Sequence, residues 1–177
     1  MKKRLYLAYG SNLNLEQMSY RCPDATVLGT AELKDWELLF KGSKTGSYLT
    51  VERCKGSTVP VGVWEVSEAD ERALDRYEGC PRFYYKKTLV LPVTNAETGE
   101  VARRRCFIYI MHEDRPEGMP YAEYVRICRQ GYLDFGFSQR YLDAAVERAW
   151  YATQGRMKQA PGQLHTRARA KKGGASA

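Results

Sequence analysis

The sequence predicts an α+β fold, built as a mixed sheet or a small closed barrel with helices at its periphery. Predicted strands outnumber predicted helices, and the helices interrupt the strands rather than alternate with them, which argues against a doubly wound α/β sheet. The chain has 177 residues, 44% hydrophobic and 28% charged. This is enough for one domain with a sizeable core. We therefore expect one folded domain over residues 1–154.

The chain begins with a strand, a sharp turn and a short helix. Apolar and aromatic residues dominate positions 4–9 and predict the strand, which Gly10, Ser11 and Asn12 interrupt. Asn14 is a favoured helix N-cap, and Gln17 stands three residues later, as in a capping box. A helix is therefore predicted from there to about residue 21.

The middle of the chain is rich in strand-forming residues. Aromatic, aliphatic and β-branched side chains predict strands over residues 36–41, 48–53 and 61–66, with turns at 42–46 and 55–58. A helix follows over residues 68–77. Ser67 is its predicted N-cap, Asp70 completes a capping box, and Gly79 follows its end.

Two further strands and two helices complete the predicted domain. The strands cover residues 86–94 and 103–111. The first helix runs from residue 121 to about 129 and is predicted to end at Gly131, and the second runs from residue 139 to about 152. Residues 155–177 contain six basic residues and no acid, and we expect a disordered tail there. Without this tail the net charge falls from +7 to +1, so a nucleic-acid-binding surface is not indicated.

Several functional classes are disfavoured by what the sequence contains. The five cysteines are scattered and never form a CxxC pair, which argues against a disulfide framework or a zinc site. His112 is the only histidine in the predicted domain, so a metal centre built from several histidines is not expected. No apolar run approaches the roughly 20 residues that span a bilayer, and the N-terminal apolar stretch is too short for a signal peptide. We expect a cytoplasmic protein without a metal ion.

The segment Tyr9-Gly10-Ser11-Asn12-Leu13 is the first candidate site, because it lies between a strand and a helix. Glycine permits a sharp turn, for which we expect a positive φ at Gly10, and a close approach to a ligand. Successive backbone N–H groups at such a turn bind a carboxylate or an oxyanion. A plain strand-to-helix turn is the alternative. Tyr6 shares a strand face with Gly10, so its side chain either lines the same site or fills the core.

Glu78 is the candidate acid/base residue. It stands at the C-terminal end of a predicted helix, where the helix dipole disfavours a negative charge and, with partial burial, raises the pKa of the carboxyl group. A raised pKa suits a general base near neutral pH. The alternative is a solvated surface glutamate. Tyr124, on a helix after a loop rich in Pro and Gly, is a third candidate or else a filler of core or surface.

Three segments in this order resemble the γ-glutamylcyclotransferase superfamily, including AIG2-like proteins. They are YGSNL at residues 9–13, RALDRYEGCPRFYYKK at 72–87 and YVRICRQG at 124–131, and the resemblance covers roughly residues 4–150. It implies a small mixed β-barrel flanked by helices, with one cavity. It also implies that the backbone of residues 9–13 holds a γ-glutamyl group, that Glu78 is the acid/base residue and that Tyr124 helps to close the site.

The implied activity is cyclisation of a γ-glutamyl amine or peptide to 5-oxoproline with release of the amine, without a metal or organic cofactor. The partner is then a small γ-glutamyl molecule, and the sequence selects neither which one nor an oligomeric state. Two alternatives remain. One is a non-catalytic module that binds a small molecule on the same scaffold. The other is an adaptor that uses the basic tail.

Overall fold

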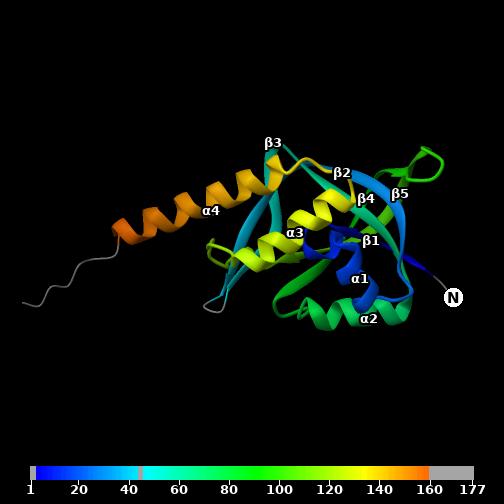
Figure 1. Ribbon diagram of the computed structural model, residues 1–177, viewed down its shortest axis with the longest axis horizontal. Coiled ribbons are helices and arrows are strands. Elements are labelled where there is room, and N and C mark those ends of the chain that lie inside the picture. Colours follow the sequence, from blue (N-terminus) through cyan, green and yellow to red (C-terminus); the bar gives the residue numbers. More distant parts are fainter. Residues whose placement is uncertain (1–2, 44–45, 160–177) are drawn as a thin grey trace, which may run out of the picture.

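Five strands close into a mixed barrel, and helices flank it (Figure 1). The computed structural model describes residues 3–43 and 46–159. The strand order around the barrel is β1-β3-β2-β4-β5, where β1 runs parallel to β5 and all other neighbours are antiparallel. The strands are β1 (Arg4–Ala8), β2 (Thr26–Ser43), β3 (Gly46–Val66), β4 (Tyr84–Asn95) and β5 (Val101–Met111). The predicted α+β class and the barrel are confirmed.

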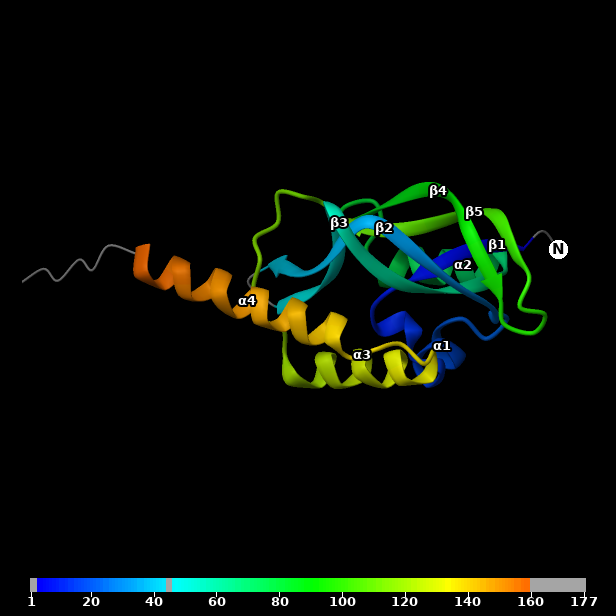
Figure 2. The same ribbon diagram turned by 90° about the horizontal axis from the view of Figure 1, so that it is seen from above.

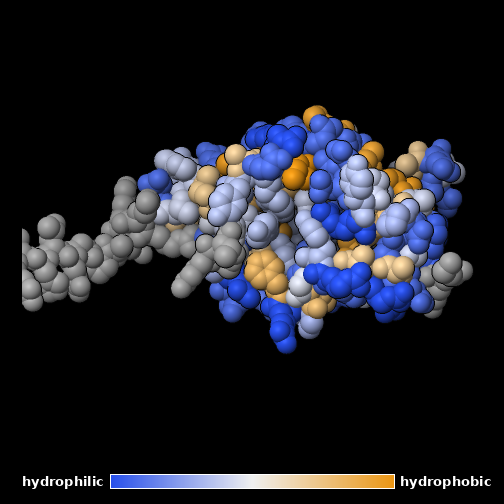
Figure 3. Space-filling model, turned by 60° about the horizontal axis from the view of Figure 1, so that its bottom comes forward, coloured by the Kyte–Doolittle hydropathy of each residue, from blue (hydrophilic) through white to orange (hydrophobic). Residues whose placement is uncertain are grey.

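The helices lie on the outside of this barrel. They are the short 3-10 helix η1 (Ser11–Leu13), α1 (Leu15–Arg21), α2 (Glu68–Tyr77), α3 (Ala122–Asp134) and α4 (Arg140–Gln159). Helices α3 and α4 lie on one side of the barrel, and α4 extends away from it (Figure 2). The face that carries α1, α2 and α3 is mostly hydrophilic, with small apolar patches (Figure 3). No helix among the described residues combines the length and apolar character needed to cross a membrane.

Strands β2 and β3 form one long, bent hairpin, and the predicted turn at residues 55–58 is wrong. Opposite Asp35 the two strands slip register, which leaves residues 54–57 of β3 without a partner on β2. Asp35 and Gly56 have φ angles of 62° and 84°, and the Gly56 N–H donates to Asp35 Oδ1 at 2.9 Å. The Gly, Ser and Thr residues here form a bulge that bends the strand without ending it. The first half of β2, from Thr26 to residue 35, was not predicted from the sequence.

Helix α2 begins as its sequence predicts. The Asp70 N–H donates to Ser67 Oγ at 3.1 Å, and the Ser67 N–H donates to the Asp70 carboxylate at 3.0 Å. This capping box satisfies two backbone donors that the first turn of a helix otherwise leaves free. The helix ends with Glu78 as its C-cap and Gly79 at a φ of 61°. The local signals therefore place Glu78 at the C-terminal end of α2.

Helix α3 does not end at Gly131, which corrects the prediction. The helix continues to Asp134, and Gly136, with a φ of 67°, follows it. A Cβ atom on Gly131 would lie 2.6 Å from the Asn14 nitrogen and 2.7 Å from the Leu13 carbonyl carbon. Glycine is required here because α3 packs directly against the backbone that leaves η1.

Helix α4 runs to Gln159, five residues beyond the expected domain boundary at residue 154. Its inner face buries Leu142, Ala145 and Ala149, so its first turns belong to the core. The remainder of the predicted tail, residues 160–177, lies outside the described residues.

Replacing Gly131 by alanine is expected to destabilise the protein by about 1–3 kcal/mol, because the added methyl group overlaps backbone atoms that cannot move independently. On an exposed helix the same change gains about 1 kcal/mol. Urea unfolding followed by circular dichroism measures the difference. Gln130→Ala, at an exposed position of the same helix, is the matched control. A stabilised Gly131→Ala protein would contradict the packing described here.

Candidate active site

A cavity of about 290 Å³ lies where the loop after β1 meets the end of α2. Its walls are mainly aromatic, with a few polar groups: Tyr6, Tyr9, Gly10, Ser11, Asn12, Tyr48, Leu49, Tyr77, Glu78, Phe83, Tyr84, Tyr109 and Tyr124. Of the eight residues that the sequence analysis selected, only Leu13 is absent from this lining. Two segments that are 66 residues apart in the chain, the YGSNL loop and the end of α2, thus form one site.

Leu13 anchors the YGSNL loop to the protein core. Its backbone N–H donates to the Gly10 carbonyl at 2.9 Å and so is used within the turn. Its side chain is fully buried, close to the Cα atoms of Gly62 and Gly131. Leu13 therefore holds the loop between the barrel and α3.

The Glu78 carboxyl group lines the cavity and has one direct hydrogen bond from the part of the chain that the structure describes. Asn12 Nδ2 donates to Glu78 Oε1 at 2.9 Å. Burial of the carboxyl group raises its pKa to about 7, although the positive charge of Arg21 and the hydrogen bond from Asn12 both act to lower it. The residue as a whole is partly exposed, so the cavity remains open to a ligand. A carboxyl group that titrates near pH 7 both accepts and returns protons at that pH.

Arg21, at the end of α1, was missed by the sequence analysis. It donates to Asn12 Oδ1 and, at 3.1 Å, to Gln17 Oε1. Its guanidinium carbon also lies 3.5 Å from the centre of the Tyr77 ring. One arginine therefore connects α1, the loop and the end of α2. Its contacts depend on tertiary packing, and no local signal distinguishes it from the other arginines of the chain.

Gly10 has a φ of −125°, so the expected positive φ is wrong. Glycine is favoured at position 10 because a side chain there has little room. A Cβ atom here would lie 3.3 Å from the Tyr124 hydroxyl oxygen and 3.4 Å from Leu49 Cβ. These contacts are tight, and any larger side chain would extend into the cavity wall.

Tyrosine hydroxyl groups tie the cavity walls together. Tyr9 donates to the Tyr109 carbonyl at 2.7 Å, and Tyr84 donates to the Leu49 carbonyl at 2.8 Å. The Leu49 N–H in turn donates to the Tyr124 hydroxyl oxygen at 3.2 Å. Burial raises the pKa of Tyr9, Tyr84 and Tyr124 well above 10, so these hydroxyl groups stay protonated. These hydrogen bonds consequently link the walls to one another through tyrosines that carry no charge.

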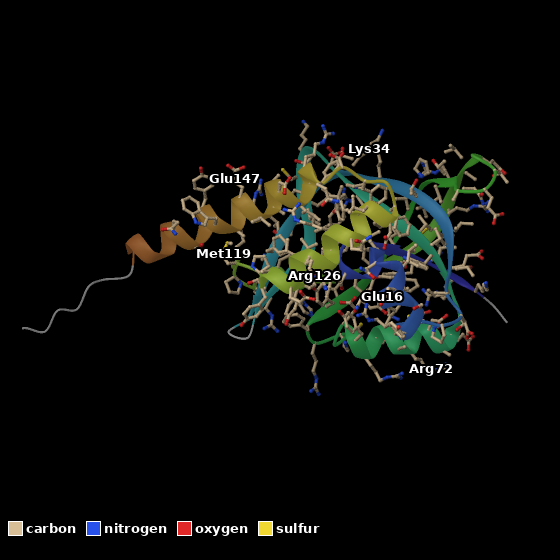
Figure 4. The ribbon with its side chains drawn as sticks, in the orientation of Figure 1. Glu16, Lys34, Arg72, Met119, Arg126 and Glu147 are labelled. Carbon is tan, nitrogen blue, oxygen red and sulfur yellow. The ribbon has the colours of Figure 1, made fainter. Side chains whose placement is uncertain are left out.

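A larger cleft, of about 840 Å³, lies between β2 and β4 and contains none of the predicted site residues. Four cations line it: Lys34, Arg53, Arg103 and Arg140. Lys34 is labelled in Figure 4. Its one carboxylate, Glu32, is exposed. This cleft offers no buried acid/base group, so the smaller cavity is the better candidate for chemistry.

The candidate site does not resemble a metal centre. Within residues 3–43 and 46–159, no three His, Cys, Asp or Glu side chains are grouped so that they could hold a metal ion. The cavity offers instead one carboxylate, an asparagine, a serine and several tyrosines. Such groups suit hydrogen bonding to a small polar molecule and proton transfer to or from it.

Comparison with known proteins shows the family to which the chain is similar. The family described as gamma-glutamyl cyclotransferase, AIG2-like, matches residues 6–126. The gamma-glutamylcyclotransferase of Homo sapiens is 30% identical over 146 residues, which cover 78% of this chain and 75% of that protein. The Mus musculus protein of the same name is 30% identical over 148 residues, with the same two coverages.

A solved structure of a gamma-glutamyl cyclotransferase agrees in fold. It aligns with a TM-score of 0.68 at 26% sequence identity and covers 81% of this chain and 86% of its own. The family match includes the YGSNL loop, Glu78 and Tyr124. This chain belongs to the gamma-glutamyl cyclotransferase, AIG2-like family.

Proposed function

We propose that the protein is an enzyme that cyclises a γ-glutamyl amine or peptide to 5-oxoproline and releases the amine. Membership of the family and relatives named gamma-glutamylcyclotransferase support the reaction class. The observation that carries the proposal is the Glu78 carboxyl group, whose pKa is raised to about 7 inside a cavity lined by tyrosines and the YGSNL loop.

The reaction requires one proton to move between two nitrogen atoms. The neutral α-amine of the substrate attacks its own γ-carbonyl carbon, which gives a five-membered ring and an oxyanion. Glu78 takes the excess proton from the attacking nitrogen. It then delivers this proton to the departing nitrogen as the original C–N bond breaks. One carboxyl group performs both steps, and no covalent enzyme intermediate or metal ion enters the scheme.

The loop supplies binding. The N–H groups of Ser11 and Asn12 stand at the start of η1, where helix N–H groups lack an acceptor within the helix. In this proposal they donate to the γ-glutamyl group and to the oxyanion that develops on it. Such donors contribute about 3–4 kcal/mol each in other enzymes. Tyr124 lies against Gly10 and closes the cavity beside the loop.

A module that binds a small molecule without converting it is the competing proposal, because the same cavity would serve both. Binding alone gives no reason for a carboxyl group held near its titration point. A mass-spectrometric screen of γ-glutamyl compounds for released 5-oxoproline distinguishes the two. Saturable binding without any 5-oxoproline would favour the module.

Glu78→Gln is expected to abolish turnover, because the amide keeps the shape of the side chain but cannot accept the proton of the amine. The measurement is the rate of 5-oxoproline release, with circular dichroism as the check on folding. If the folded variant retained a tenth of the wild-type rate, Glu78 would not be the proton carrier.

The same substitution is expected to stabilise the protein at pH 8. The pKa of Glu78 in the folded protein, about 7, exceeds the value of about 4.3 in an unfolded chain. The neutral form therefore stabilises the fold fully below pH 4, and this contribution is lost as the pH rises to 7. The loss amounts to up to about 3 kcal/mol, which glutamine avoids.

Thermal melts at pH 4.5 and pH 8 provide the measurement. The Tm advantage of Glu78→Gln over wild type should be larger at pH 8. Glu97→Gln, in the exposed turn between β4 and β5, is the control. An advantage that is the same at both pH values would show that the carboxyl group is not destabilised by burial.

Gly10→Val is expected to damage catalysis more than Ser11→Ala. The valine side chain would displace the Tyr124 hydroxyl group or Leu49, and a misplacement of about 1 Å costs roughly 100-fold in rate. Ser11→Ala removes a hydroxyl group that lies 3.3 Å from the Tyr77 hydroxyl but keeps the backbone donor, so we expect a loss of less than about tenfold. Losses in kcat/KM are compared once both variants are shown to fold. Equal or reversed losses would mean that the loop acts through its side chains.

A further inference from the structure

The hydroxyl protons of the tyrosines that line the cavity are not equally available for a hydrogen bond to a ligand. Tyr9, Tyr84 and Tyr109 each donate their hydroxyl proton to a protein acceptor: the Tyr109 carbonyl, the Leu49 carbonyl and Asp75 Oδ1, at 2.7, 2.8 and 2.6 Å. These three protons are committed. A tyrosine whose oxygen instead accepts a hydrogen bond keeps its own proton for a ligand.

Tyr6 is in this second situation, as is Tyr124, whose oxygen accepts from the Leu49 N–H; of the two, Tyr6 is the one that shares its hydrogen-bond donor with Glu78. Asn12 Nδ2 donates to the Tyr6 hydroxyl oxygen at 2.8 Å, and no group among residues 3–43 and 46–159 accepts the Tyr6 proton. The side chain is 4% exposed and lines the cavity. Its ring stacks on Phe107, with centroids 5.3 Å apart, and meets Tyr109 edge-on. The hydroxyl group is thus fixed in place with its proton unused.

Arg21 determines which way the Asn12 amide points. Arginine only donates hydrogen bonds, so the Asn12 atom that faces its guanidinium group must be the carbonyl oxygen. The amide nitrogen consequently faces Tyr6 and Glu78, at 2.8 and 2.9 Å. A single NH2 group therefore holds the Tyr6 oxygen and the Glu78 carboxylate beside each other.

We propose that the Tyr6 hydroxyl group donates a hydrogen bond to the γ-carbonyl oxygen of the substrate as it becomes an oxyanion, with Arg21 as the positioning residue that orients Asn12. This inference rests on the proposed function. No covalent bond to Tyr6 forms or breaks, since the hydroxyl group keeps its proton throughout. Burial, and then the nearby Glu78 charge, raise the pKa of Tyr6 well above 10, in keeping with a donor that never ionises.

Tyr6→Phe tests the donor directly. We expect kcat to fall by about 100- to 1,000-fold, with KM changed by less than about threefold, because the hydrogen bond strengthens in the transition state. Tyr85→Phe, outside the cavity, is the matched control. Its hydroxyl group also donates to a carboxylate, Glu113 Oε1 at 2.6 Å, and we expect less than a threefold loss. A folded Tyr6→Phe enzyme within about threefold of the wild-type kcat, or an equal loss in Tyr85→Phe, would overturn the proposal.

Arg21→Gln provides a second route if Tyr6→Phe does not fold. Without the arginine the amide can rotate, and Asn12 Oδ1 would then accept the Tyr6 proton and remove it from the substrate. We expect a lower kcat, partial recovery in Arg21→Lys, and a shift of the acidic limb of the kcat/KM profile to higher pH, because the Arg21 charge lowers the pKa of Glu78. An unchanged kcat in Arg21→Gln would refute the positioning role.

A binding measurement separates this inference from the proposed function. The ring carbonyl of 5-oxoproline can accept the same hydrogen bond, so Tyr6→Phe should bind 5-oxoproline about five- to tenfold more weakly by calorimetry, and Tyr85→Phe should not. If the wild-type protein produced no 5-oxoproline from any γ-glutamyl compound, the proposed cyclisation would fail. The affinities would still decide whether Tyr6 is a donor, and equal affinities would refute it.

Discussion

The burial of one carboxyl group at the C-terminal end of α2 is the constraint on which the site depends. Removing a carboxylate from water is costly unless hydrogen bonds or opposite charges compensate. Glu78 receives only partial compensation, from one hydrogen bond to Asn12 and from the more distant charge of Arg21, and its pKa rises to about 7. A direct ion pair would hold the carboxylate ionised and make it a weak base. The indirect arrangement, with Asn12 between Arg21 and Glu78, keeps the group close to its titration point.

Close backbone packing makes this arrangement possible. The YGSNL loop has to lie beside the end of α2, and it is fixed there from two sides. Gly62 of β3 leaves room for Leu13 and Phe135, and Gly131 of α3 leaves room for the backbone of residues 13 and 14. The loop consequently has little freedom, which is what a group of hydrogen-bond donors requires to act without reorganisation. Stability and site geometry share the same contacts.

Short-range signals explain what the sequence predicted well. The start of α2 follows from Ser67 and Asp70, which act within one helical turn, and Glu78 at its end follows from Gly79. Gly56 permits a bulge and Gly131 a close contact, and in the sequence neither can be distinguished from a glycine that ends a strand or a helix. Arg21 was missed because its contacts with Asn12 and Tyr77 depend on how α1 and α2 pack. The cavity combines residues from β1, β3, β4, β5, α2 and α3. No periodicity in the sequence indicates that these elements come together around one cavity.

The cavity at Glu78 and the cleft between β2 and β4 show that the lining residues, rather than the volume, identify the candidate site. The cleft between β2 and β4 is nearly three times larger than the cavity at Glu78, but its charged groups lie at the surface, where water screens them. The smaller cavity surrounds its carboxyl group with tyrosine rings, so that each hydrogen bond there acts in a medium of low polarity and counts for more. In that setting the direction of a single hydroxyl proton matters. Tyr9, Tyr84 and Tyr109 direct theirs to the protein and build the wall, whereas Tyr6 keeps its proton for the space that the wall encloses.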